Sequence, residues 1–164
     1  MRYKISNLQK IEKVFNKFKK YLPKAYHTVQ LSVGFTEAKT YKTYQGAYAT
    51  SFTIVLGSGY LNKNKMSEIS IAAILGHEIG HHVLGHLTKD GPLTPPEEQD
   101  ADHFGMYLCE LAGFNREKVL IHWEEFEKAR QKSLSSHHRK THGTGEERVE
   151  RLIQQDKYLK NLDW

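Results

Sequence analysis

Two histidines that stand four positions apart, with a glutamate directly after the first, are the residues of this chain that most directly suggest chemistry. They are His77, Glu78 and His81. In a helix, residues four apart lie on the same face, so both imidazoles can reach one metal ion. The carboxylate of Glu78 is then offset from the two ligands, where it can take a proton from an attacking water. The spacing therefore predicts a metal site on a helix with its own general base.

A third ligand has to come from another part of the chain, because a catalytic zinc usually has three protein ligands and one open position. Glu98 is the expected one, since it begins an acidic segment after the next turn. Asp102 follows one helical turn later and should accept the free ring N–H of a ligand histidine, with His77 as the expected partner. A solvated acidic face is the weaker alternative for these two carboxylates. The expected cofactor is Zn²⁺, although a site of nitrogen and oxygen ligands can also accept cobalt or manganese.

Six other histidines are interpreted as packing or surface residues. His82 and His86 form a second pair four residues apart, but we expect them to project from a different face of the helix than the ligands do. The same interpretation applies to His103, His122, His137 and His138. Cys109 is the only cysteine, so neither an intrachain disulfide nor a cysteine-based zinc site can form.

The elements that must position these residues begin with an amphipathic helix over residues 6 to 22, where apolar residues recur every three or four positions. We expect its apolar stripe to pack on the body of the domain, and contact of this basic helix with a membrane surface is the alternative. Residues 28 to 56 are rich in β-branched and aromatic residues, which predicts three short strands.

Three further helices follow the one that carries the histidine pair. That helix is expected to begin at Ser67 and to continue through His86. The segment TPPE at residues 94 to 97 is a good helix start, with a threonine cap and proline at the first helical position. Helices are also predicted at 116 to 130 and at 147 to 159. The polar segment at 133 to 146 reads as a loop.

This order of elements predicts an α+β fold, in which a small mixed sheet of about three strands packs on the metal helix and further helices. We expect one domain over residues 1–164, with the amphipathic helix in residues 1–24 and a catalytic body in residues 28–160.

The net charge of +5 comes largely from lysine-rich stretches. We interpret these as solvated helix faces and keep a nucleic acid partner as the weaker alternative, because no nucleic-acid motif accompanies them. No stretch approaches the roughly 18 apolar residues of a membrane span, and the first residues lack the apolar core of a signal peptide. A cytoplasmic location is therefore expected.

Between residues 45 and 152 the chain resembles the gluzincin metallopeptidases that include HtpX and the CAAX prenyl endopeptidases. The segments GAYA at 46–49 and ISIAAILGHEIGHHVLGH at 69–86 resemble the substrate strand and the metal helix of that family. EQDADHFG at 98–105 resembles its E-x-x-A-D segment, and AGFNREKVLIHWEEF at 112–126 resembles the stretch that follows. THGTGEERVERL at 141–152 resembles a loop that precedes an arginine-bearing final helix.

The resemblance implies roles for individual residues. It implies that His77, His81 and Glu98 are zinc ligands, that Glu78 is the general base and that Asp102 orients a ligand. It matches His142 to a loop histidine near the metal, which either helps to stabilise the transition state or fills the open position and makes the enzyme latent. Arg148 matches the arginine after that loop. An extended substrate would pair with the strand that contains Ala47, Tyr48 and Ala49. The chain departs from the family at Gly46, where asparagine is expected, and at Gly143, where proline is expected.

Without membrane spans, the chain resembles the soluble, single-domain minigluzincins. The expected function is a zinc-dependent endopeptidase that hydrolyses soluble or unfolded polypeptides. One alternative is a protease that acts on a DNA-associated protein, as in ImmA/IrrE-like or SprT-like families, although a SprT-like site would use a histidine as third ligand. The other is a catalytically silent zinc-binding regulatory protein, in which His142 or a terminal segment permanently fills the open position.

Overall fold

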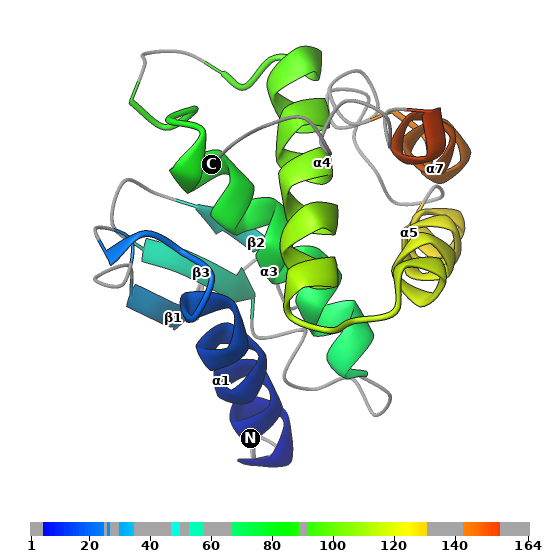
Figure 1. Cartoon of the computed structure of the whole chain (residues 1–164). Helices are drawn as coiled ribbons and strands as arrows, with labels where there is room; N and C mark the ends of the chain where they lie inside the picture. Colours follow the sequence, from blue (N-terminus) through cyan, green and yellow to red (C-terminus); the bar gives the residue numbers. More distant parts are fainter. Residues whose placement is uncertain are drawn as a thin grey trace, which may run out of the picture.

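Helices dominate the computed structural model of the chain, which describes residues 5–24, 26, 30–34, 47–49, 53–57, 67–88, 92–130 and 143–154. Within these residues there are five helices: α1 (Ile5–Lys19), α3 (Glu68–Val83), α4 (Pro95–Leu111), α5 (Arg116–Arg130) and α7 (Gly145–Gln154). Helix α4 crosses α3 at the centre of the molecule, with the strands on one side and α5 and α7 on the other (Figure 1).

Three short strands lie beside α3: β1 (Gln30–Gly34), β2 (Ala47–Ala49) and β3 (Thr53–Gly57). Their order is β1-β3-β2. Strand β1 runs parallel to β3, and β2 runs antiparallel to it with Ala47 opposite Leu56. Strands β2 and β3 both contact α3.

The fold class expected from the sequence is wrong. In an α+β fold the sheet would form one of the main packed layers. Here the strands are only three to five residues long, whereas the helices have 10 to 17 residues. The described part of the chain is therefore mainly helical. The physical reason lies in α3, in which all residues from 71 to 81 are buried. A helix that is buried on all sides needs cover all around it, and α1, α4 and α5 supply most of that cover.

Helix α1 packs its apolar stripe on the body of the protein, as expected, although it ends before residue 22. Its buried side chains are Ile11, Val14, Phe15 and Phe18. The ring of Phe18 meets Phe114 edge to face, with 5.9 Å between the centroids. Among the described residues, no helix combines the length and the apolar character that a membrane crossing requires.

The boundaries of the central helices follow from their caps. Helix α3 begins after Ser67, whose Oγ accepts a hydrogen bond from the Ser70 N–H at 3.0 Å. Helix α4 begins after Thr94, whose N–H and hydroxyl both donate to the Glu97 carboxylate. Helix α3 ends at Val83 and not at residue 86, because the chain turns there into a left-handed glycine. Helix α5 has the bounds predicted for it, and α7 begins two residues earlier than expected.

Candidate metal centre

The helices α3 and α4 approach each other closely at small residues that alternate with the candidate site residues. A Cβ atom added to Gly80 would lie 2.8 Å from the carbonyl oxygen of Ala101. One added to Gly76 would lie 2.9 Å from that of Gly105. Each of these contacts is between backbones, so no side chain can move away to relieve it. The close crossing brings the histidines of α3 within reach of the carboxylates of α4.

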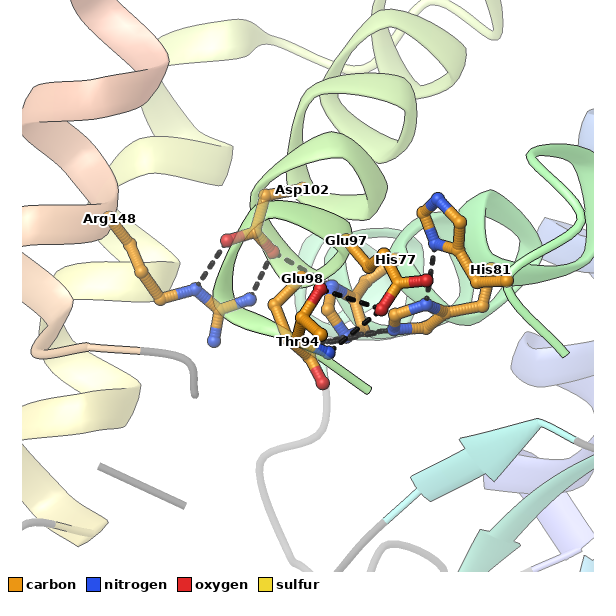
Figure 2. Close-up of polar contacts among 8 residues, drawn as sticks. His77, His81, Thr94, Glu97, Glu98, Asp102 and Arg148 are labelled. Atoms are coloured by element: carbon orange, nitrogen blue, oxygen red, sulfur yellow. Dashed lines mark hydrogen bonds and ion pairs between the residues drawn. The ribbon is translucent and has the colours of Figure 1, made fainter. Parts of the chain in front are cut away.

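Three buried side chains converge where the two helices cross. His77 and His81 come from α3 and Glu98 from the first turn of α4, and they are 6%, 2% and 3% exposed. Their ligand atoms all lie within 4.8 Å of one another. Figure 2 shows the two imidazoles and the Glu98 carboxylate pointing toward one another.

The spacing of these atoms tests whether a metal ion fits. The two Nε2 atoms of the histidines are 3.2 Å apart, and Glu98 Oε2 lies 3.3 Å from His77 Nε2 and 3.4 Å from His81 Nε2. Ligand atoms that each lie about 2.0–2.1 Å from a tetrahedral zinc are about 3.3 Å apart. The three atoms thus form a nearly equilateral face of the right size, and the donor set of two imidazoles and a carboxylate suits zinc.

A charged network supports His77 from behind. Its Nδ1 lies 2.8 Å from Asp102 Oδ1, and the other oxygen of Asp102 accepts a hydrogen bond of 2.8 Å from Arg148 Nε. Arg148 Nη2 donates to Oδ1 as well, so the guanidinium grips the carboxylate with two bonds (Figure 2). The guanidinium also stacks on the ring of Trp123, with 3.8 Å from Cζ to the centroid. With its Nδ1 proton directed at Asp102, His77 can offer the lone pair of Nε2 to a metal ion once Nε2 has lost its proton.

The pKa values of this network reflect its two carboxylates. Burial alone lowers the pKa of His77, but hydrogen bonds to Asp102 and Glu98 outweigh it and raise this pKa to about 10. Burial would raise the pKa of Asp102, yet the charge of Arg148 and the hydrogen bond to His77 hold it well below its usual range. The pKa of His81, in contrast, is lowered, chiefly by burial. The negative potential that raises the pKa of His77 also favours a cation at this position.

Glu78 lies one residue after His77 in the buried stretch of α3 and is itself 6% exposed. Its charge contributes to the raised pKa of His77. A buried carboxylate beside the ligands is where a proton acceptor for an attacking water would be needed.

The candidate substrate residues Ala47, Tyr48 and Ala49 form β2, at one edge of the strand order, and β2 contacts α3. The described structure covers their backbone pairing and not their side chains. His142 lies outside the described residues, as do Gly46, His137 and His138. Gly143 stands where the resemblance predicts a proline, and its φ of 76° is one that the ring of a proline cannot adopt.

The positions of two residues near the site were not predicted from the sequence. Trp123 stacks on Arg148 and meets the ring of His77 edge to face, with centroids 6.1 Å apart. His86 lies with its Nδ1 3.1 Å from Nδ1 of His81, so the expectation that it projects away from the ligands is wrong. The sequence feature that could have predicted this position of His86 is Gly85, because a glycine there ends the helix and turns the chain back. Trp123 had no comparable local signal, because its partner lies on another helix.

Comparison with known proteins gives one match. The sequence model of peptidase family M48 matches residues 12–94, which is half of the chain and runs from within α1 to the residue before α4. No curated protein sequence and no solved structure is similar enough to count as a match. The matched segment includes the histidine pair and stops before Glu98, so the assignment of the third ligand depends on the geometry described above.

Proposed function

The chain belongs to peptidase family M48, and on this premise we propose that it is a zinc-dependent endopeptidase with His77, His81 and Glu98 as metal ligands and Glu78 as general base. The observation that carries the proposal is the face of three ligand atoms, with sides of 3.2, 3.3 and 3.4 Å. Membership of the family implies a metallopeptidase that acts on peptides, and the choice of zinc follows from the donor set.

The zinc ion would supply a Lewis acid that makes a water acidic near neutral pH and withdraws electrons from a peptide carbonyl. The residues of the chain supply the rest. Glu78 takes the proton of the attacking water and returns it to the amine that leaves. Asp102, gripped by Arg148, keeps His77 in the orientation and tautomer that a ligand needs.

We further propose that the substrate binds as an extended strand beside β2. Among the described residues β2 pairs with β3 alone, and β2 contacts the helix that carries the ligands. Pairing through the backbone of Ala47, Tyr48 and Ala49 would hold a peptide with little dependence on its sequence. Soluble or unfolded polypeptides are therefore the substrates that fit best.

Within the family, we assign the chain to the HtpX and CAAX prenyl endopeptidase type, as a minigluzincin-like single catalytic domain. The motifs that follow the histidine pair support this assignment, and so does a glutamate in the third ligand position. A SprT-like protease would have a histidine there. The buried Glu78 favours an enzyme over a silent zinc protein, because a purely structural site has no use for a base.

The test is cleavage of casein, an unfolded protein, by the zinc-loaded protein and by Glu78→Gln. We expect the variant to bind as much zinc as the natural chain and to lose at least about 100-fold in rate, because general base catalysis is worth that much. Equal rates for both proteins would refute the mechanism.

If neither protein cleaves casein, His142→Ala decides between latency and a silent role. Cleavage by this variant, and its loss in the double variant with Glu78→Gln, would identify a latent peptidase. No cleavage by His142→Ala would favour the silent regulatory protein.

A further inference from the structure

The C-terminal end of α3 is closed by a cap that links two histidines. After Leu84 the chain enters a left-handed conformation at Gly85, with φ of 73°. The Gly85 N–H donates to the His82 carbonyl at 3.2 Å, and the His86 N–H donates to the His81 carbonyl at 3.1 Å. These two bonds define a Schellman cap, in which the residue after the glycine folds back over the last turn of the helix. The Thr88 hydroxyl holds the turn by donating to the Gly85 carbonyl at 2.7 Å.

A Schellman cap usually ends in an apolar contact between the two residues that its longer backbone bond joins. Here those residues are His81 and His86, and the contact between their side chains is polar. The Nδ1 atoms lie 3.1 Å apart, with 5.3 Å between ring centroids and an interplanar angle of 65°. The same short motif therefore joins the two residues twice, once through the backbone and once through the rings.

The other ring nitrogen of His81 decides what this contact does. His81 Nε2 lies 3.2 Å from His77 Nε2 and 3.4 Å from Glu98 Oε2, so it faces the ligand set. A neutral histidine that offers the lone pair of Nε2 carries its proton on Nδ1, and that proton needs an acceptor. His86 Nδ1 is at hydrogen-bond distance and can accept it if the proton of His86 is on its own Nε2.

We propose that His86 is a positioning residue for His81: it accepts the Nδ1–H of this ligand and so holds the ring with Nε2 toward the metal. The inference rests on the proposed metal site. His86 touches neither the metal nor the substrate, and it corresponds to Asp102 on the other ligand. A neutral acceptor suits this position, because Glu78, Glu98 and Asp102 are already buried here and another carboxylate would add a further buried negative charge.

The test compares His86→Asn with His86→Leu. The amide oxygen of asparagine stands one bond from Cγ, as Nδ1 of histidine does, so it can still accept the proton from His81. Leucine fills similar space without an acceptor. We expect zinc affinity, measured by competition with a chelator, to fall by roughly 10- to 100-fold in His86→Leu. Most of this loss should be absent in His86→Asn, and the visible spectrum of the cobalt-loaded protein should change only in His86→Leu.

A merely structural cap predicts the reverse order, because leucine would restore the usual apolar contact of the motif. Zinc affinity in His86→Leu equal to or above that in His86→Asn would therefore overturn the proposal. His86→Ala is a second acceptor-free variant, for use if His86→Leu does not fold. The matched control is His82→Asn, which removes a histidine from the same turn and should leave zinc affinity within about 2-fold, far less than the loss of an outer-shell partner.

His77→Ala separates this inference from the proposed function. If His77→Ala retains the zinc affinity of the natural chain, the proposed metal site itself is wrong. If His77→Ala loses zinc and His86→Leu does not, the metal site stands and the role of His86 is wrong. Thermal unfolding of each variant without added metal shows whether the fold has been kept.

Discussion

The two histidines proposed as metal ligands are supported in opposite ways. Behind His77 stands a charged network, Asp102 with Arg148 on Trp123, that draws on helices α4, α7 and α5. Behind His81 stands one neutral residue, His86, only five positions along the chain. The first support exists only when three helices are docked, and the second is part of a local turn. One half of the site therefore depends on tertiary structure, while the other depends on the end of a single helix.

The largest effect is expected from Arg148→Ala, which breaks the distant support and leaves the local one intact. It leaves the buried charge of Asp102 without its arginine partner, and losing one member of a buried pair typically costs about 3–5 kcal/mol. Urea denaturation measures the free energy of unfolding. Lys13→Ala is the control, since it removes an exposed ion pair with Glu68 that is worth under about 1 kcal/mol. Similar losses in the two variants would mean that the network does not support the site.

The pH dependence of zinc binding sharpens the same comparison. The pKa of His77 is raised to about 10, so near neutral pH zinc must displace a proton from this ligand. The pKa of His81 is lowered, so that ligand is already neutral. We expect zinc affinity to fall about tenfold for each pH unit below 10 and about one proton to be released per zinc. Titration calorimetry in buffers of different ionisation enthalpy measures that proton, and release of none would contradict the raised pKa.

The stability of the zinc-free protein depends on pH in the opposite direction to its zinc affinity. Because the pKa of His77 in the folded state lies above the value of about 6.5 expected when unfolded, protonation stabilises the fold fully below pH 6.5. This contribution is lost as the pH rises toward 10. Zinc should therefore raise the unfolding temperature more at pH 8 than at pH 6.

A smaller effect that acts on both ligands is expected from Gly80→Ala. The new Cβ would lie 2.8 Å from the Ala101 carbonyl oxygen and 2.9 Å from its Cα, which forces α3 and α4 apart. Overpacking of this kind costs about 1–3 kcal/mol, and zinc affinity should fall because the ligands come from both helices. Thermal unfolding and chelator competition measure the two effects. Since the clash is with backbone atoms, Ala101→Gly should not restore either property, and a rescue would show that the spacing of the helices is not the cause.

How much of the fold and of the candidate site could be predicted depends on how close together in the sequence the interacting residues lie. The caps at Ser67 and Thr94 and the bounds of α5 follow from sequence patterns, and the structure has them. It also brings His77, His81 and Glu98 together, while their roles stay predictions. The fold class was wrong because the pattern that predicts strands does not show how short they will be or how little of the buried helix they will cover.

The positions of His86 and Trp123 were not predicted, for two different physical reasons. His86 was treated as part of a helix that in fact ends at Val83, so its expected direction was wrong, although Gly85 carried the correct signal. Trp123 acts through Arg148, 25 positions away on another helix, and no local pattern joins the two. Contacts within a turn can be predicted from sequence, whereas contacts between separate helices need the packed structure.

The location of Arg148 on the last described helix has a consequence for how the protein is made. A ribosome synthesises the chain from its N-terminus, so the three candidate ligands and Asp102 all emerge before the arginine that balances Asp102. Until α7 has been made and has docked, Asp102 lacks this partner and His77 lacks a firmly held support. The nascent chain would therefore gain its full hold on zinc only after α7 has been made and has docked. Firm capture of the metal would then report that α7 has docked on α4 and α5.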